Sequence, residues 1–498
     1  MISSFYKALA GRIAALAVGL VCGCLSLKLY GRYLPKEVYG VVVVALQVVG
    51  YLPFLDGGFR TTTNREILAE RDAEKRYRLI NFAQTFYSLF AVIIFPAALA
   101  LMIGYSFTPT VSGSGEPRWF FAALALTGTI SIVGWAQIGL LVGLEAQTSF
   151  YAMNAVSGLV GLGTLWLSLR NGLGIWAFPI STCAGLLICY PLALWLIRRK
   201  EPRIRFFQWK AGADFWSQFK HLGRDAWPCF RVEVGAAFLY TVDLVLVALI
   251  CGSKSAAIYG VVSRLIAMTR SFLQATGEVA WPLVAQKSGS SHALGTFLLR
   301  FNGWLIGSVV GAMALTLGPF LGYYMGPSWT PPRLLTLLLT GRLLVTGTCS
   351  AAPYLLMGLG QFALVARYMQ RELLGAVVLG VSLGLIFGMT GIALGFLIST
   401  GFGTFASYFY AYGRAVNIPG GSLMWQAWWR AIIAYGVGIT VSALLLPWSH
   451  SAWQTFGVGA VAATAAVTTG LVVCGVRLSR SPGSSAMAFK LGDLAAKI

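Results

Sequence analysis

The feature that most constrains this chain is the recurrence of apolar runs of about 20 residues from one end to the other. A helix of that length crosses the ~30 Å hydrocarbon core of a bilayer, and the runs leave no stretch long enough for a separate soluble domain. Only 11% of the residues are charged, against roughly 25% in soluble domains. We therefore expect an all-α polytopic membrane protein.

Hydropathy and helix-breaking residues predict about fourteen membrane-spanning helices. The first apolar run follows Lys7 and Arg12 and could pass for a signal peptide, but it lacks a small-residue cleavage site, so we expect it to be retained. The helices are expected near residues 8–31, 38–57, 79–104, 118–143, 150–169, 174–197, 226–252, 256–280, 298–325, 332–357, 361–387, 390–413, 428–447 and 453–476.

The distribution of Lys and Arg predicts the orientation, because these residues accumulate in cytoplasmic loops. Six basic residues fall within 60–78 and eight within 198–224, whereas the intervening loops hold about one each. Both termini are therefore expected in the cytoplasm. Lys28, Arg32 and Lys36 are an exception, since they lie at the outer end of the first hairpin.

The net charge of +21 would suggest nucleic acid as a partner in a soluble protein. Here the densest basic cluster, RRKEPRIRFFQWK (198–210), lies between two apolar runs and mixes basic with aromatic residues. That composition suits an anionic membrane surface, so we expect no nucleic acid partner.

Three pairs of similar segments indicate an internal duplication. Residues 37–58 and 257–278 share Tyr-Gly-Val-Val at an offset of 220, and 141–151 resembles 356–366 at an offset of 215. Residues 174–182 resemble 391–400 at an offset of 217 to 218. Each interval holds six predicted helices, and an even number makes both halves cross the membrane in the same sense.

The duplication predicts five parts of the chain. They are an N-terminal six-helix bundle at 1–200, a cytoplasmic amphipathic linker at 201–225, a C-terminal six-helix bundle at 226–415, helices 13 and 14 at 416–477 and a cytoplasmic tail at 478–498.

Several stretches resemble the multidrug/oligosaccharidyl-lipid/polysaccharide exporter superfamily, in particular its bacterial polysaccharide transporters, the lipid-linked oligosaccharide flippases. The resemblance covers nearly the whole chain. It depends on GRYLPKEVYG (31–40) leading to FLDGGFRTTTNREIL (54–68), on YTVDLVLVALICGSKSAAIYG (240–260) and on GLGQFALVARYMQRELLGAVVLGVSLGLIFGMTGIALG (358–395).

The resemblance implies two six-helix bundles that rock around a central cavity and open it to each side in turn. It implies a flippase that carries an undecaprenyl-pyrophosphate-linked oligosaccharide from the inner to the outer leaflet of a bacterial inner membrane. The product would serve O-antigen (lipopolysaccharide), capsule or exopolysaccharide biosynthesis. The implied partners are this lipid, membrane lipids, a polysaccharide polymerase and chain-length machinery, and no cofactor is expected.

Ionisable residues within the membrane are costly and are therefore functional candidates. Asp243 and Arg264 stand eleven and ten residues either side of Lys254, so we expect them at matching depth as an ion pair. Such a pair would either lock two helices together or gate transport.

Arginines are the expected substrate-binding residues. Arg342, within 332–357, is the leading candidate, followed by Arg367 and Arg371, which share one face of the next helix. With Arg264, they predict a positive interior. Arg presents a rigid fork of donors that matches the oxygens of a pyrophosphate. Arg270 is more prone than Arg367 to extend to the lipid headgroups instead.

A dense polar segment at 56–65 follows the second predicted helix. Gly57 and Gly58 would release the backbone from the helix, and Asp56 would satisfy its free polar groups. The segment either only caps the helix or also forms a cytoplasmic entrance through Arg60 and Arg65.

The driving force is left open by the sequence. An ion gradient would act through Asp243, Asp56, Glu233 or Glu145, whereas membrane potential would act on the arginines. Consumption of the product downstream is the third alternative.

Three other functions remain as alternatives. A multidrug cation antiporter would need surplus carboxylate in its cavity, and the multidrug antiporters of this superfamily usually have twelve helices rather than fourteen. The predicted count of fourteen helices resembles that of the lipid II flippases. A membrane enzyme is disfavoured, because the longest outward loop, 105–117, offers only Glu116 and no nucleophile-base pair, phosphate-binding glycine loop or metal cluster is found in the sequence.

Overall fold

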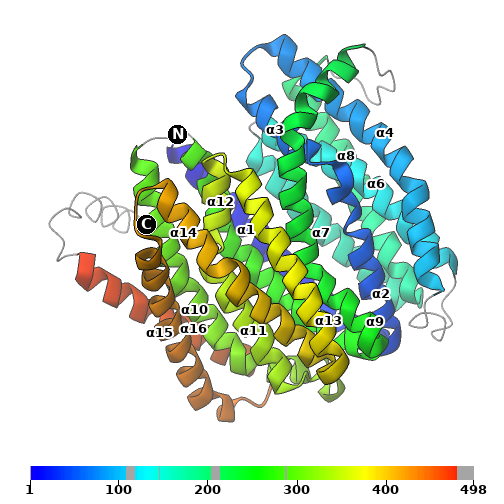
Figure 1. The fold of residues 1–498 in the computed structure, drawn as a ribbon. Coiled ribbons are helices and arrows are strands. Elements are labelled where there is room, and N and C mark those ends of the chain that lie inside the picture. Colours follow the sequence, from blue (N-terminus) through cyan, green and yellow to red (C-terminus); the bar gives the residue numbers. More distant parts are fainter. Residues whose placement is uncertain (1, 108–117, 145, 204–212, 286–288, 479–498) are drawn as a thin grey trace.

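The computed structural model describes residues 2–478 apart from 108–117, 145, 204–212 and 286–288 (Figure 1). Every regular element in this described part is a helix, which confirms the expected all-α class. Glu116, Glu145 and the predicted tail beyond 478 lie outside the described residues.

The helices follow the apolar runs of the sequence. They are α1 (Ile2–Tyr33), α2 (Lys36–Val49), α3 (Phe59–Ala69), α4 (Ala73–Ser106), α6 (Arg118–Gly143), α7 (Gln147–Arg170), α8 (Ala177–Lys200), α9 (Ala213–Ala285), α10 (Gly289–Met325), α11 (Arg333–Thr348), α12 (Ala351–Gly358), α13 (Phe362–Thr400), α14 (Ala406–Ala415), α15 (Gly420–Leu445) and α16 (Ala452–Leu478). Short 3₁₀ segments include η1 (Leu52–Asp56) and η3 (Pro327–Trp329), and η4 (Gly401–Phe405) is a π-helical turn.

The two longest elements, α9 and α13, are each a pair of helices. Gly252 in α9 and Gly388 in α13 have positive φ angles of 80° and 64°, which reverse the chain where only glycine adopts such a conformation readily. Contacts across each reversal are antiparallel: Tyr259 donates a hydrogen bond to Asp243 at 2.9 Å, and Gly395 lies against the backbone of Gly380. We call residues 213–251 and 253–285 the first and second arms of α9.

The number of membrane-spanning helices is partly tested. Eleven segments of the described chain are long and apolar enough to cross a bilayer. Two of them, Asp214–Ala275 and Phe362–Ala415, contain the reversals at Gly252 and Gly388, and α16 is not among the eleven. The expected count of fourteen therefore stays a prediction.

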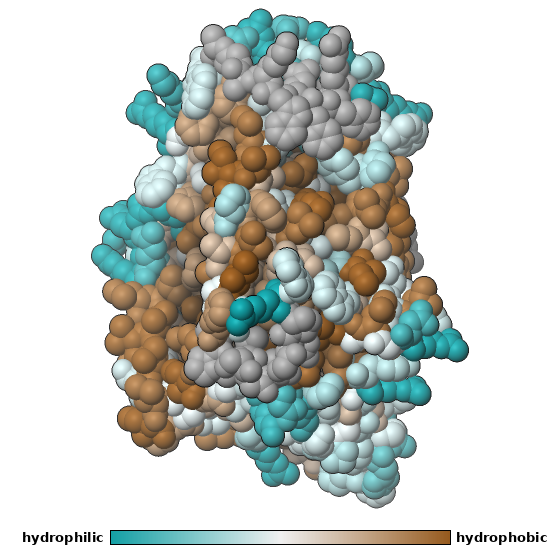
Figure 2. Space-filling view, turned by 90° about the vertical axis from the view of Figure 1, so that its right-hand side faces the viewer, coloured by the Kyte–Doolittle hydropathy of each residue, from teal (hydrophilic) through white to brown (hydrophobic). Residues whose placement is uncertain are grey.

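The surface agrees with a membrane protein. Figure 2 shows apolar side chains over much of the middle of the molecule, with hydrophilic ones at both ends and in smaller patches between them. Large apolar residues such as Leu187, Leu385 and Phe402 are strongly exposed on helix faces. Exposure of this kind is expected where side chains face lipid rather than water.

The repeated Tyr-Gly-Val-Val segments meet at the centre of the molecule. Gly260 of the second α9 arm packs against Val43 of α2, and Gly40 of α2 lies against the carbonyl of Ser253. The residue numbers rise together along this contact, so the two helices run in the same sense, as the duplication predicted. In Figure 1, α4, α6 and α8 lie on one side of this centre and α10 to α16 on the other.

The two C-terminal helices lie outside the repeats. Gly303, Gly307 and Gly311 of α10 approach the backbone carbonyls of Ala427, Ala431 and Tyr435 of α15. Small residues at this spacing let two membrane helices approach closely. Helix α15 is therefore fixed to the C-terminal half through α10.

The two halves are joined at the end that carries the short outward connections. Glu37 and Lys254 form an ion pair at 2.9 Å, and Lys36 donates a hydrogen bond to the carbonyl of Ser328. We call the Glu37–Lys254 pair the outer latch. By the distribution of basic residues, this closed end is the expected outer side.

Candidate functional site

A cavity of about 520 Å³ lies between the two halves. Its walls come from α2, η1, α3, both arms of α9 and the segment from α11 to α14. We call it the central cavity. It has the size of a small-molecule site, for which ~300–1,000 Å³ is usual.

Five charged residues line the central cavity: Arg60, Glu233, Arg270, Glu278 and Glu372. Three carboxylates therefore face two guanidinium groups, and the expected surplus of positive charge is not found there. The expectation of a positive interior was wrong because the depth of an arginine along its helix does not show whether its side chain faces the cavity.

Two of the glutamates are neutralised by arginines. Glu233 accepts a hydrogen bond from Thr61 and lies 3.9 Å from Arg60. Glu278 pairs with Arg12 at 2.8 Å. Both pairs join the N-terminal half to an arm of α9.

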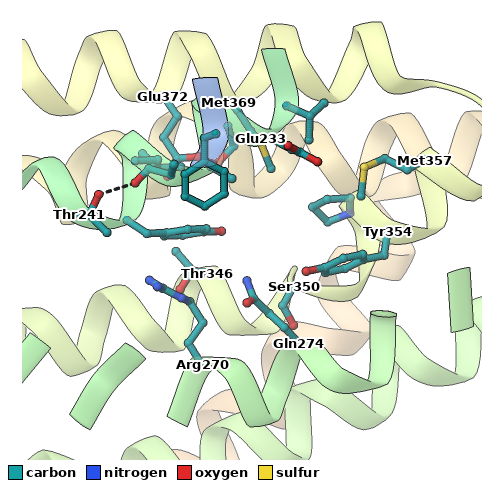
Figure 3. A pocket seen from close by; sticks show the side chains of 18 of the residues that line it. Glu233, Thr241, Arg270, Gln274, Thr346, Ser350, Tyr354, Met357, Met369 and Glu372 are labelled. Atoms are coloured by element: carbon teal, nitrogen blue, oxygen red, sulfur yellow. Dashed lines mark hydrogen bonds between the residues drawn. The ribbon is translucent and has the colours of Figure 1, made fainter. Parts of the chain in front are cut away.

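Arg270 and Glu372 have no such partner. The Arg270 guanidinium lies 3.8 Å from the centre of the Tyr240 ring, and no carboxylate in the described chain comes within 4.0 Å of it. Figure 3 shows Arg270 and Glu372 on opposite sides of the pocket. Arg270 therefore faces the cavity and not the headgroups, contrary to the sequence expectation.

Glu372 is a buried carboxylate held by hydroxyl groups. Its side chain belongs to a residue only 3% exposed, and it accepts hydrogen bonds from Thr400 at 2.7 Å and from Thr404. The π-helical turn η4 carries Thr404, and such turns often occur at functional sites. No Lys, Arg or His of the described residues lies within 4.0 Å of this carboxylate.

Arg342, the leading sequence candidate, is buried behind the cavity wall. Its guanidinium donates hydrogen bonds to Asp243 at 2.8 Å and to the Leu239 carbonyl, and it lies 4.7 Å from the centre of the Phe396 ring. Arg342 and Asp243 line a much smaller space of about 30 Å³. It shares Tyr240, Arg270 and Thr346 with the central cavity. The pair ties α11 to α9.

The expected ion pair of Asp243 with Arg264 is wrong. The chain reverses at Gly252 and not at Lys254, so Asp243 lies opposite Tyr259. Arg264 is five residues further along, or about 7.5 Å at the helical rise. It donates a hydrogen bond to Ser26 of α1 at 3.3 Å and lies 5.6 Å from the Tyr30 ring centre.

The polar segment is organised differently from the expectation: α2 ends at Val49 rather than at residue 57, and Asp56 satisfies the start of the next helix, α3. Gly57 and Gly58 have φ angles of 71° and 78°. The Asp56 carboxylate accepts hydrogen bonds from the Gly58 and Arg60 backbone amides, at 2.9 and 3.1 Å, and from Tyr87 at 2.8 Å. Asp56 thus caps the start of α3 and positions Arg60 in the cavity wall.

The remaining arginine candidates lie elsewhere. Arg65 pairs with Asp225 of α9 at 2.8 Å and does not line the central cavity. Arg367 and Arg371 are exposed near the start of α13. The structure therefore brings Arg60 and Glu233 together at the cavity and keeps the other predicted binding residues apart from it.

The sequence reasoning missed a signal for the cavity face of the second α9 arm. Arg270, Gln274 and Glu278 recur at intervals of four residues, and all three line the cavity. A polar stripe at this spacing marks one helix face.

Metal ligands form no comparable cluster. Among the residues described, no three His, Cys, Asp or Glu side chains are grouped so that they could hold a metal ion.

The chain matches one known protein family over more than half of its length. Residues 13–288, more than half of the sequence, match the family described as polysaccharide biosynthesis protein. The chain belongs to this polysaccharide biosynthesis family. No curated protein matches it.

Solved structures with a similar fold include a flippase and multidrug transporters. The lipid II flippase MurJ in an inward closed conformation superposes with a TM-score of 0.66 at 15% identity, over 95% of this chain and 100% of that one. The MATE multidrug transporter DinF-BH gives 0.61 at 14% identity, over 83% and 95%. An outward-facing MATE family transporter of the MOP superfamily gives 0.59 at 12% identity, over the same shares. This member of the polysaccharide biosynthesis family therefore has the fold of flippases and multidrug transporters.

Proposed function

We propose that the chain is a flippase that moves an undecaprenyl-pyrophosphate-linked oligosaccharide from the inner to the outer leaflet by alternating access. The observation that carries this proposal is the match to the polysaccharide biosynthesis family, together with a flippase-like fold built around a central cavity. The product would enter O-antigen, capsule or exopolysaccharide biosynthesis.

Arg270 is our leading candidate for binding the pyrophosphate. It is a cavity cation without a carboxylate partner in the described structure, and its forked donors suit phosphate oxygens. Arg60 is the second candidate, since it would be released for the substrate if its 3.9 Å contact with Glu233 opened.

The other predicted binding residues receive supporting roles. Arg264 would fix the second α9 arm, which carries Arg270, through Ser26, and Arg342 would fix the adjoining first arm through Asp243. Arg65, Arg367 and Arg371 would attract the headgroup at the membrane surface before it enters. Exposed cations act in this way through long-range attraction to phosphate.

For coupling to an ion gradient, we propose Glu372 as a stronger candidate than Asp243, Asp56 or Glu233. Asp243 and Glu233 already face arginines, and Asp56 accepts three hydrogen bonds. A buried carboxylate without a cation is costly unless it takes up a proton or a metal ion. Glu372 is therefore the proposed binding site for a proton or a metal ion.

We further propose a bacterial inner membrane location with both termini cytoplasmic, in agreement with the distribution of basic residues. The outer latch would then be closed and the Arg60 end of the cavity would face the cytoplasm. A polysaccharide polymerase and chain-length machinery are the proposed partners downstream.

A multidrug cation antiporter is the second candidate. The specific observation in its favour is the excess of one carboxylate over guanidinium groups in the cavity lining, with Glu372 unpaired. The MATE-like fold is compatible with it.

The test is translocation in proteoliposomes. The wild type should make a fluorescent undecaprenyl-pyrophosphate-linked oligosaccharide of the inner leaflet accessible to a glycosidase added outside. Arg270→Gln should lose most of this activity, whereas the matched variant Arg414→Gln, at an exposed position at the end of α14, should keep it. Failure of the wild type on several sugar lipids, with uptake of a cationic dye under an imposed ion gradient, would favour the antiporter instead.

A further inference from the structure

A second cavity lies at the outer ends of α1 and α7. It has a volume of about 230 Å³ and is lined by Leu25, Lys28, Leu29, Arg32, Tyr33, Leu162 and Trp166. We call it the outer groove. It shares no lining residue with the central cavity.

The outer groove is positively charged and contains no acidic side chain. Lys28 and Arg32 are four residues apart on α1, so they lie on one face of the helix. Arg170 adds a third cation, 5.5 Å from the centre of the Trp166 ring. Within the described residues, none of the three has a carboxylate within 4.0 Å.

This charge is unusual for its position. Basic residues normally gather at the cytoplasmic ends of membrane helices, yet these three lie at the helix ends expected on the outer side. The aromatic contacts of Lys28 with Tyr324 and of Arg32 with Tyr33, both at 5.6 Å, do not neutralise them. An anionic ligand at this end would offset their repulsion.

The groove opens toward the lipid. Leu25 and Trp166 are each 45% exposed, and they continue toward the membrane centre as Val21 on α1 and Leu159 on α7, which are also exposed. The site therefore combines a cationic end at interface depth with an apolar track along two helices. A ligand that fits both parts has an anionic headgroup and a hydrocarbon chain.

We propose that the outer groove binds an anionic phospholipid of the outer leaflet. Its phosphate lies between Lys28 and Arg32, and one acyl chain follows Leu25, Leu29 and Leu162. Trp166 lies at the interface, where its ring suits the headgroup boundary. This inference is independent of the transported substrate, because the groove is separate from the central cavity.

The experiment compares phosphatidylglycerol with phosphatidylcholine on the purified full chain. Native mass spectrometry after exchange into equal mixtures of the two lipids measures which one is retained. The wild type should retain phosphatidylglycerol preferentially. Each of Lys28→Gln and Arg32→Gln should weaken that preference about fivefold, since a basic residue near a membrane surface contributes roughly 1 kcal/mol.

Two further variants make the test specific. Arg333→Gln removes an exposed cation at the outer start of α11 that does not line the groove, and should leave the preference unchanged. Leu162→Trp should fill the apolar track and reduce lipid retention although both cations remain. Each variant is first checked for an unchanged Tm and elution volume.

Three results would overturn the proposal. One is equal retention of the two phospholipids by the wild type, and another is an equal loss of preference in Arg333→Gln and Arg32→Gln. The third is retention of undecaprenyl pyrophosphate that falls in Lys28→Gln and Arg32→Gln while retention of phosphatidylglycerol stays unchanged, which would identify the groove as a site for the polyprenyl lipid.

Discussion

At the scale of single residues, the Arg342–Asp243 pair is the clearest stabilising contact inside the membrane. Asp243 accepts hydrogen bonds from Arg342 and Tyr259, and both charged side chains are nearly inaccessible. Removing one member of a buried pair leaves the other uncompensated, which costs roughly 3–5 kcal/mol. Arg342 therefore stabilises the fold by neutralising Asp243, whatever substrate the protein carries.

We expect Arg342→Met to lower the Tm and the amount of protein in the membrane, because Asp243 would be left charged and buried. The double variant Arg342→Met/Asp243→Asn should recover most of the lost stability, since an amide still accepts the Tyr259 hydrogen bond. Thermal unfolding in detergent measures both. A single variant with wild-type Tm would show that the pair contributes little.

Glu372 leads to a different prediction, because its partners are hydroxyl groups. The two threonines, Thr400 and Thr404, donate to different oxygens of Glu372. A glutamine accepts from one threonine through its oxygen and donates from its NH2 group to the hydroxyl oxygen of the other, so Glu372→Gln should fold with a Tm at or above that of the wild type. It should transport down a substrate gradient but no longer respond to an imposed ion gradient. Transport assays with and without that gradient decide this, and a retained response would remove Glu372 as the coupling site.

At the scale of helices, the start of α3 shows how closely the two halves approach. A Cβ atom on Gly58 would lie 2.4 Å from the Ala226 carbonyl oxygen and 2.5 Å from the Phe230 amide of α9. Asp56 holds this turn by accepting hydrogen bonds from the Gly58 and Arg60 amides. Glycine at position 58 is therefore required for contact as well as for backbone conformation.

Gly58→Ala should destabilise the protein more than Gly172→Ala does. Both glycines have similar φ angles, 78° and 76°, so both variants incur the conformational strain of roughly 1–3 kcal/mol. Nothing lies within 4 Å of a Cβ at Gly172. The difference between the two Tm values isolates the close approach to α9, and equal values would contradict it.

The sequence predicted the positions of the helices better than it predicted which side chains pair between them. Breaker residues predicted the reversals near Gly252 and Gly388, and the repeat of Tyr39-Gly40 at Tyr259-Gly260 predicted that the two halves cross in the same sense, but not that these segments touch. The pairing of Asp243 depended on the rotation of each helix and on a third helix, α11, that lies about a hundred residues further along. A depth count contains neither quantity, so Arg264 was given the wrong partner.

At the scale of the whole molecule, the arrangement of ion pairs suggests how the two halves alternate. The outer latch closes one end through Glu37 and Lys254, whereas Arg12–Glu278 and Arg65–Asp225 cross between the halves toward the other. Lys254 and Glu278 lie toward opposite ends of the second α9 arm, and Asp225 lies near the start of the first arm. Opening one end by tilting α9 would therefore strain contacts at the other.

The outer latch should bias this equilibrium only weakly. Both partners are substantially exposed, and exposed pairs contribute ~0.2–1 kcal/mol, so Lys254→Gln should increase the outward-open population by no more than about fivefold. The readout is the rate at which a membrane-impermeant thiol reagent labels Gln47→Cys in the central cavity from outside, in a background without native cysteines. The charge-swapped variant Glu37→Lys/Lys254→Glu should restore the wild-type rate, because the ion pair is re-formed. An unchanged labelling rate in Lys254→Gln would mean that close packing, such as that of Gly40 on the Ser253 carbonyl, closes the outer end without help from the latch.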